Sequence, residues 1–419
     1  MFLFDAVAKS SVLYCKGHSG YYSCTKCKQK GIYINDRVCF PDLVSEPRTN
    51  ECFLSLNENN NFLSGVSILG DIPNINFVSD IPLDYMHLIC LGVVKRLVVQ
   101  TWAFGPIPHK LCARDFNKIS LNLESLKQFI PSDFARVPRG LSESKRWKAT
   151  EFRQFLLYSG PVVLKNVLPP TKYFHFLSLH VAIVILINKK HCDTYLDYAE
   201  QLLEHFVKST KIIYGTHYLS HNFHNLLHIV DDVRKHGCLD KFSNFSSENY
   251  LYYIKKLIRK PSDVLEQIIK RIGEIEKHIS SPKNCNLSDK NNFEMGNPHN
   301  DGVLVNNCGG PQYKTAKFID FSISINKKDC CCVLKNNIII TAENFAFCSS
   351  TNEFVVVGRC FETVQDFYDQ PCNSSNFGIF FVKNLSDLNY WPIKYIKNKL
   401  IKLPYTDGFV VLPLLHHDE

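Results

Sequence analysis

The predicted fold depends on two stretches of the sequence, Cys24-Thr25-Lys26-Cys27 and His224-Asn225-Leu226-Leu227-His228. A Cys-x-x-Cys turn can present two sulfurs to one metal ion, and a tetrahedral zinc then needs two more ligands. Histidines four residues apart on a helix lie on one face, which is a common way to hold zinc. The preferred interpretation is therefore a structural Cys₂His₂ zinc site that joins two distant segments of the chain.

Other residues could complete a zinc site with the two cysteines. Cys15, His18 and Cys39 are close to the Cys-x-x-Cys turn in sequence, and His217 and His221 extend the histidine stripe. Histidines at helical spacing can equally be half-buried side chains that bond to backbone or water. The residues alone leave these alternatives open, and the remaining cysteines, out of 17 in total, are expected to be reduced thiols.

The composition predicts a globular protein. The chain has 419 residues, is 45% hydrophobic and carries a formal net charge of +8. At roughly 150 residues per domain, this length suggests two or three domains. The apolar and charged fractions exclude a disordered, collagen-like or coiled-coil chain. The mild positive charge permits nucleic-acid binding but does not require it.

No secretion signal and no membrane span are expected. The apolar run 1–4 meets Asp5 too early for a signal peptide. The longest apolar stretch, 174–188, contains His175 and His180 and is shorter than the about 20 residues that span a membrane. We expect a buried helix there, and we expect the protein to reside in a reducing compartment.

Hydrophobic periodicity divides the chain into five expected regions. The first is mixed α/β with a strand at 1–4, and the next two are helical because apolar residues recur every three or four positions. An asparagine-rich segment suits a linker, and short β-branched runs after it suit a small all-β domain. The regions are 1–81, 82–215, 216–280, 281–312 and 313–419, and the expected helices are 83–102, 142–158, 193–214, 219–236, 246–260 and 262–279.

Three carboxylates are candidate catalytic residues, although each has a simpler explanation. Asp5 ends an apolar run, Asp84 opens a helix three residues before His87, and Glu248 lies in the first turn of another helix. Taken singly, each is more simply a helix cap or a carboxylate stabilised by the helix dipole, and His87 would pack beneath its helix. These positions need further support before they indicate catalysis.

Two basic clusters could follow the phosphates of a nucleic acid, although a solvated helix surface explains such clusters more often. Trp147 lies within the first cluster. The members are Arg136, Arg139, Lys145, Arg146 and Lys148 in the first, and Lys255, Lys256, Arg259, Lys260, Lys270, Arg271 and Lys277 in the second.

Several of these motifs together resemble animal transposon-encoded proteins with a DDE-type transposase domain. At superfamily level the chain is similar to the CACTA-like group and, more distantly, to Transib-type transposases. The resemblance covers most of residues 1–280, and the tail ending Pro413-Leu414-Leu415-His416 is also similar to such proteins. The segments that carry it are Phe4–Lys9, Gly17–Cys27, Arg48–Phe53, Asp84–Leu88, Lys145–Arg153, His224–His228 and Glu248–Leu251.

The resemblance implies an α/β plus α fold, with a partial ribonuclease-H-like core, a large helical insertion and a small all-β C-terminal domain. In such folds three acids hold two Mg²⁺ or Mn²⁺ ions that promote DNA phosphodiester cleavage and strand transfer. The zinc pattern of the superfamily maps onto Cys24, Cys27, His224 and His228. Its third acid maps onto Glu248.

The remaining acids can be mapped in two ways. If Asp5 is the second acid, the first would lie on an upstream strand, and the domain would be N-terminally truncated. Alternatively, Asp5 is the first acid and Asp84 the second. The first mapping is preferred because it places the zinc cysteines as the superfamily does. It predicts Mg²⁺ ligands at Asp5 and Glu248 and a chain that cannot cut DNA by itself.

The resemblance therefore implies a transposase-derived protein of the nucleus, with the cytoplasm as an alternative. Its partner would be double-stranded DNA at transposon ends, and a homo-oligomer is compatible with it. Neither a membrane nor a small-molecule substrate is expected. The alternative function is that of a non-catalytic remnant that binds DNA, chromatin or another protein.

Overall fold

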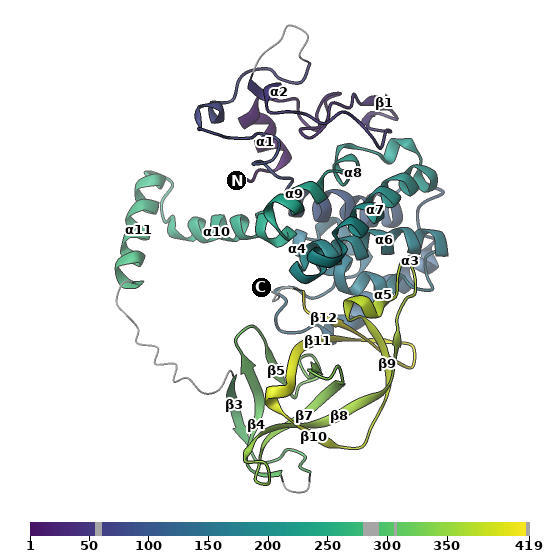
Figure 1. Ribbon diagram of the computed structural model, residues 1–419, viewed down its shortest axis with the longest axis vertical. Coiled ribbons are helices and arrows are strands. Elements are labelled where there is room, and N and C mark those ends of the chain that lie inside the picture. Colours follow the sequence, from purple (N-terminus) through teal and green to yellow (C-terminus); the bar gives the residue numbers. More distant parts are fainter. Residues whose placement is uncertain (55–60, 280–292, 306–307, 416–419) are drawn as a thin grey trace.

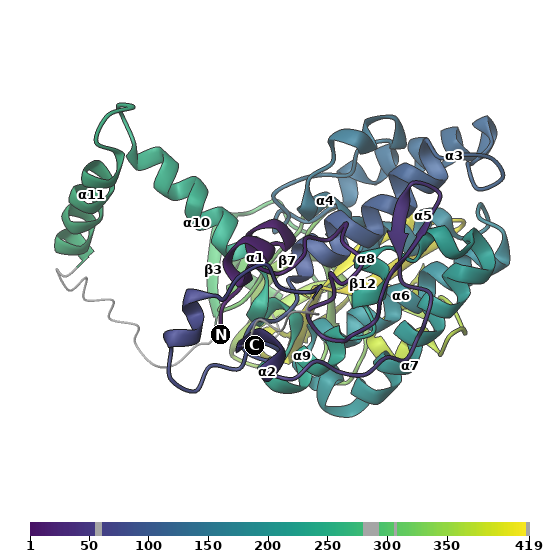
Figure 2. The ribbon, with the colours of Figure 1, turned by 90° about the horizontal axis from the view of Figure 1, so that it is seen from above.

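The protein is arranged in three layers with a projecting arm. The computed structural model describes residues 1–54, 61–279, 293–305 and 308–415. An N-terminal lobe lies on one side of a helical body, and a β-rich C-terminal part lies on the other (Figure 1). Two helices, α10 (Asn244–Leu257) and α11 (Val264–Ile279), stand away from these layers (Figures 1 and 2). The fold is thus a mixture of helices and sheet, as expected.

The N-terminal lobe is small and contains little regular structure. Its elements pack around a cluster of buried side chains that includes Phe53, Phe62 and Phe77. In the hairpin of two short strands, Asn35 and Asp36 adopt φ of 49° and 61°, which suits a two-residue turn between antiparallel strands. The elements are α1 (Ala6–Leu13), β1 (Ile32–Ile34), β2 (Arg37–Cys39), α2 (Glu51–Leu54) and η1 (Ile68–Asp71).

A ribonuclease-H-like core is not confirmed. Within the described parts of 1–81, the strands are β1 and β2 alone, and residues 1–4 form no strand. Phe2 and Phe4 instead pack against the cluster of the lobe, and the N–H of Phe2 donates to the carbonyl of Asp80. The expected strand at 1–4 is therefore wrong, because the neighbouring segment that would pair with it is absent from this lobe as described.

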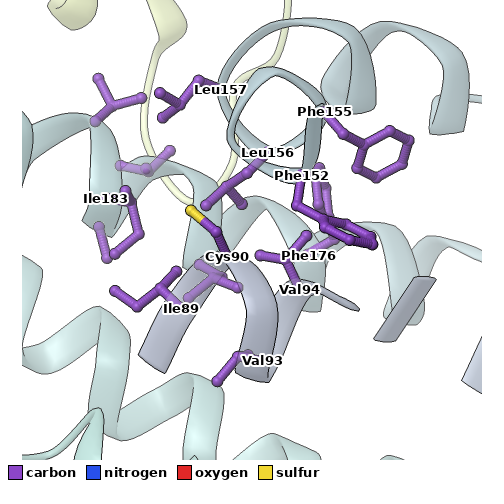
Figure 3. Packing of buried hydrophobic residues seen from close by; sticks show 14 of the residues in the cluster. Ile89, Cys90, Val93, Val94, Phe152, Phe155, Leu156, Leu157, Phe176 and Ile183 are labelled. Atoms are coloured by element: carbon purple, nitrogen blue, oxygen red, sulfur yellow. The ribbon is translucent and has the colours of Figure 1, made fainter. Parts of the chain in front are cut away.

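The helical body, residues 82–243, surrounds one large apolar cluster, in which Cys90, Leu156 and Ile183 meet (Figure 3). Every side chain from His175 to Ile187 on α6 is buried, so this helix is covered on all sides. The elements are η2 (Met86–Val94), η3 (Arg96–Ala103), α3 (Ala113–Ser125), η4 (Leu126–Phe129), η5 (Leu141–Arg146), α4 (Ala149–Gln154), η6 (Phe155–Ser159), α5 (Gly160–Leu164), α6 (Pro170–Ile187), α7 (Lys189–Tyr214), η7 (Thr216–Tyr218), α8 (His221–Asn225), α9 (Ile229–His236) and η8 (Leu239–Phe242).

Two helical stretches, Met86–Ala103 and Pro170–Ile187, are long and apolar enough to cross a membrane by length and composition. Within them, 67% and 72% of the residues are buried inside the protein, respectively. Core helices meet the same criterion, and α6 is the buried helix expected over 174–188.

The expected helices are present with two interruptions. At Trp147 the backbone is extended (φ −61°, ψ 141°), which separates η5 from α4. The expected helix over 219–236 is divided into α8 and α9 by residues 226–228. Gly215 and Gly237 follow the ends of α7 and α9 with φ of 96° and 87°, a backbone conformation that glycine adopts readily.

The C-terminal part is a closed six-stranded antiparallel barrel with additional strands. One side chain from each barrel strand joins a buried cluster: Cys331, Ile339, Phe361, Val382, Leu400 and Val411. The barrel closes through β6 (Cys331–Leu334), β7 (Ile339–Cys348), β8 (Glu353–Asp366), β9 (Phe380–Leu385), β12 (Gly408–Pro413) and β11 (Ile396–Tyr405), which pairs again with β6.

The far halves of β7 and β8 extend beyond the barrel and pair with other strands. β4 (Cys308–Phe318) pairs with β7, β3 (Phe293–His299) and β5 (Ser322–Ser324), whereas β10 (Asn389–Pro392) pairs with β8. On the barrel exterior, Ile401, Leu403 and Val410 join the apolar cluster of the helical body. The barrel is therefore docked on the helices through its β11–β12 hairpin.

The strand positions correct the expected linker over 281–312. Residues 293–299 form β3 and residues 308–312 begin β4, because these residues pair with each other and with β7. The asparagine-rich residues 280–292 lie outside the described part of the chain, as does His416 of the tail motif. The β region therefore begins earlier than the composition predicted.

Candidate metal centre

Cys24 and Cys27 lie on a tight turn of the N-terminal lobe. The backbone N–H groups of Lys26 and Cys27 both donate to the Cys24 Sγ, each at 3.4 Å. Such donors favour the thiolate form of cysteine, which is the form that binds metals. The two sulfurs are 3.6 Å apart, and both side chains are buried. The turn therefore presents two sulfurs to one point inside the protein.

His224 and His228 complete the group from the opposite side. His224 belongs to α8, and His228 precedes α9 with φ −112° and ψ −10°, so the two histidines flank a break rather than sharing one continuous helix. The Nε2 of His224 lies 3.2 Å from the Cys27 Sγ and 3.3 Å from the Nε2 of His228. All four potential ligand atoms lie within 4.8 Å of one another.

The donor set fits a structural zinc ion. Zinc bonds of about 2.0–2.3 Å in a tetrahedron place the ligand atoms about 3.3–3.8 Å apart, close to the observed separations of 3.2, 3.3 and 3.6 Å. Hydrogen bonds with Cys24 and with His224 hold the pKa of Cys27 far below its ordinary value, whereas burial raises the pKa of Cys24. These four residues could hold a metal such as zinc.

The other zinc ligands that the sequence allowed do not join this group. Among the residues that the structure describes, Cys24, Cys27, His224 and His228 are the one group of three or more histidine, cysteine or acidic residues placed to hold a metal ion. The Cys39 thiol faces the Arg37 carbonyl. The Nδ1 of His221 lies 2.9 Å from the Ser23 hydroxyl.

Buried cations hold the cysteine turn in place, and the sequence reading missed them. The Arg48 Nε donates to the Cys24 carbonyl at 2.8 Å. The Lys26 Nζ lies 2.5 Å from Asp232 Oδ1, and both side chains are buried. The second oxygen of Asp232 accepts the N–H of Leu83 at 2.8 Å. Lys26 lies inside the Cys-x-x-Cys motif and Asp232 follows His228 by four residues, so this ion pair ties both halves of the metal centre together.

The three candidate acids lie near one another but have different partners. Asp5 caps α1, because its Oδ1 accepts the N–H of Ala8 at 2.6 Å. Glu248 lies in α10 with an exposed side chain, and its Oε1 is 3.8 Å from the Nε2 of His87. Asp5, Asp84 and Glu248 all raise the pKa of His87 electrostatically, and the largest contribution is the hydrogen bond that His87 donates to Asp84. His87 is therefore the residue on which all three carboxylates act.

Asp84 is engaged through both of its carboxylate oxygens. Oδ1 accepts the backbone N–H groups of Met86 at 3.3 Å and of Asn244 at 2.8 Å. Oδ2 accepts two donors of His87, the backbone N–H at 3.0 Å and the ring Nδ1–H at 2.5 Å. Burial favours a raised pKa for Asp84, but these hydrogen bonds outweigh it and the pKa is lowered. Asp84 therefore caps its helix, as the simpler explanation held, and it also orients His87, which the sequence reading did not identify.

A cavity of about 240 Å³ lies beside this acidic site. Asp5, Lys9, His18 and His87 are among the residues that line it, and they come from the N-terminal lobe and from the start of η2. The Lys9 Nζ donates to the Pro82 carbonyl at 3.0 Å, and burial lowers the pKa of Lys9 to about 8. The cavity thus combines acidic and basic groups at the boundary between the lobe and the helical body.

The first basic cluster is only partly available to a partner. Arg139 binds Glu151 at 2.6 Å and Glu143 at 3.1 Å, and Trp147 is buried in the helical body. The remaining members of this cluster are exposed: Arg136, Lys145, Arg146 and Lys148.

The comparisons with known proteins concern the C-terminal part. A family described as "Domain of unknown function (DUF8592)" matches residues 298–414. This segment begins near the end of β3 and reaches one residue past β12, so it corresponds to the β-rich part of the structure. No curated protein matches the chain.

Proposed function

We propose that this chain is a transposase-derived protein of the DDE type that binds double-stranded DNA in the nucleus. The observation that carries the proposal is the Cys₂His₂ group, whose four members are the ones that the resemblance assigns to zinc. Their two pairs are far apart in the chain, so their meeting depends on the tertiary fold. The position of Asp5 and Glu248 beside His87 is a second, weaker support.

Asp5 and Glu248 are the residues that would hold a Mg²⁺ or Mn²⁺ ion. When bound, such ions activate the attacking oxygen and stabilise the leaving oxygen of a phosphodiester. Asp5 uses one oxygen as a helix cap, Glu248 is exposed, and both oxygens of Asp84 are engaged. Because no group of three acids forms in the described parts of the chain, we expect DNA binding without cleavage by this chain alone.

DNA contact would use the exposed basic residues rather than the net charge. Lys145, Arg146 and Lys148 are exposed near the start of α4. Each lysine or arginine that neutralises a phosphate releases a counterion, so the affinity falls as salt rises. This term is independent of base sequence and suits a first test.

The test of DNA binding is a salt titration of the chain with a fluorescently labelled duplex. We expect reversible binding, and changing Lys145, Arg146 and Lys148 to Glu should lower the salt slope by about 2–3. The matched control changes the exposed Lys190, Lys208 and Lys211 of α7 to Glu and should leave the slope near that of the parent chain. Equal slopes for both triple variants would contradict this surface, and no binding at low salt would contradict the function.

A separate test addresses cleavage. The chain is incubated with a supercoiled plasmid in Mg²⁺ or Mn²⁺, and we expect nicking no greater than in the presence of a chelator. Nicking that both Asp5→Asn and Glu248→Gln abolish, with Lys190→Glu unaffected, would overturn the expectation of an inactive chain. It would then favour the catalytic alternative at these two acids.

A further inference from the structure

Helix α11 carries an apolar stripe with the spacing of a coiled coil. Leu265, Ile268, Ile272 and Ile275 follow one another at intervals of three, four and three residues, which is the a/d pattern of a heptad repeat. Ile269 widens the stripe. Leu265 and Ile269 are 71% and 64% exposed, whereas Ile268, Ile272 and Ile275 are half-buried, so the apolar face is most open in the first half of the helix.

The rest of the described chain covers this stripe only in part, because Ile275 lies beside Leu257 at the end of α10. No side chain between residues 246 and 277 is buried. The arm formed by α10 and α11 projects from the helical body in both views (Figures 1 and 2). α10 meets α11 at a corner, where Leu257 and Arg259 lie near Glu274 and Ile275. A 16-residue amphipathic helix in water is marginally stable without packing on its apolar face, so the arm needs a partner.

The charges beside the stripe indicate what the partner is. With Leu265 and Ile272 at a, Arg271 occupies a g position and Glu276 the e position of the next heptad. In a parallel coiled coil, a g residue meets the e residue five positions further along the neighbouring helix. Arg271 would therefore meet the partner subunit's Glu276, and Glu276 would meet the partner subunit's Arg271. An antiparallel pair would place like charges together.

We propose that α11 assembles with α11 of other copies of this chain in a parallel coiled coil, which makes the protein a homo-oligomer. Isoleucine at both d positions favours three or four helices over two, and the exposed Ile269 at an e position agrees with a wider apolar face. This proposal does not depend on DNA binding. Because Glu248 lies near the start of α10, the assembly would hold this end of each arm beside the acidic site.

The experiment measures the mass of the zinc-loaded 419-residue chain by light scattering between roughly 1 and 100 µM, the range of ordinary reversible assembly. We expect a trimer or tetramer that dissociates on dilution. Ile272→Glu/Ile275→Glu should weaken assembly by at least about 100-fold, since it places charges in the apolar seam. Lys270→Glu, on the outer face of α11, should leave the mass unchanged.

Unchanged zinc content and helix content would show that each variant is folded. A chain that is monomeric throughout the range, or a double variant with the mass of the parent chain, would overturn the proposal. The proposal would also be overturned if the chain were monomeric and the double variant bound DNA more weakly, because the arm would then contact DNA rather than another copy.

A charge exchange tests the parallel arrangement. Arg271→Glu and Glu276→Arg should each weaken assembly, and the double exchange should restore it to within about threefold. Arg271 also binds Glu274 of its own helix at 3.0 Å, and the double exchange does not restore that pair. Recovery would therefore report contact between copies, whereas additive losses would overturn the parallel pairing.

Discussion

The metal centre and the acidic site lie at neighbouring contacts of the N-terminal lobe, yet their polar atoms are satisfied differently. At the metal centre, two sulfurs and two imidazole nitrogens face one another in a largely buried space. At the acidic site, Asp5 caps a helix, Asp84 binds four donor groups and Glu248 is exposed. Buried sulfurs and imidazole nitrogens that converge on one point suit a bound cation, whereas capped or exposed carboxylates do not need one. Zinc is therefore expected to be needed for folding, and a second metal only for function.

The largest effect should follow from removing the zinc ion. Cys24→Ser or His228→Ala should abolish about one bound zinc per chain and lower the free energy of unfolding by on the order of 5 kcal/mol, because binding of a structural zinc contributes directly to folding. Metal analysis and thermal unfolding measure the two effects. Cys39→Ser, a change at another buried cysteine near the turn, should keep the zinc. Full zinc content in both ligand variants would contradict the assignment.

A smaller loss should follow from breaking the buried ion pair beside the zinc. Lys26→Met leaves Asp232 charged and buried without its partner, which costs about 3–5 kcal/mol in comparable cases. Urea unfolding measures this change. Lys394→Met breaks the more exposed pair with Glu353 and should cost less than about 1 kcal/mol. Similar costs for the two changes would show that the Lys26 pair does not hold the metal centre.

A third test separates the acid sensitivity of the helical body from that of the metal centre. Burial lowers the pKa of His175 to about 3 and that of His180 to about 4. Below the unfolded value of about 6.5, the unfolded chain binds protons that the native chain does not. Stability is therefore fully present above about pH 6.5 and falls as the pH drops toward 4, by about 1.4 kcal/mol per pH unit for each histidine.

Urea unfolding between pH 7 and pH 5 checks this slope in the chain and in His180→Gln, whose amide can still donate to the Leu156 carbonyl that His180 binds. As the pH falls, the free energy of unfolding of the variant should drop by about 1.4 kcal/mol less per pH unit than that of the parent chain. His205→Gln, at an exposed position, is the control. A slope that His180→Gln leaves unchanged would assign the acid sensitivity to other groups, among them the zinc ligands.

The smallest effect distinguishes the two tasks proposed for Asp5. Asp5→Ala removes the cap of α1 and should cost about 1 kcal/mol, whereas Asp5→Asn caps equally well and should cost close to nothing. Binding of Mn²⁺, followed by the electron paramagnetic resonance of the free ion, should be weakened by both changes, because it needs the carboxylate. If Asp5→Asn kept full Mn²⁺ affinity, Asp5 would be a helix cap and nothing more.

Some parts of the fold could be predicted because the signals are local. The buried helix over 174–188 and the last residues of α7 and α9 agree with the helices expected from apolar runs, which end at 214 and 236. β3 and the first residues of β4 were missed, because glycine, asparagine and proline in this segment suit a loop and the pairing partners are distant in the chain. The strand expected at 1–4 was wrong for the same reason, since a strand exists only where another strand pairs with it.

The sequence by itself identified candidate zinc ligands, among them the pairs Cys24/Cys27 and His224/His228, because ligand chemistry and spacing within each pair are local properties. It also determined the apolar spacing of α11. Only the tertiary structure decided that the two pairs meet and that Lys26 and Asp232 hold them together. It also decided that both carboxylate oxygens of Asp84 accept hydrogen bonds from nearby donors. These features depend on contacts between segments far apart in the chain, and such contacts leave no periodic signal in the sequence.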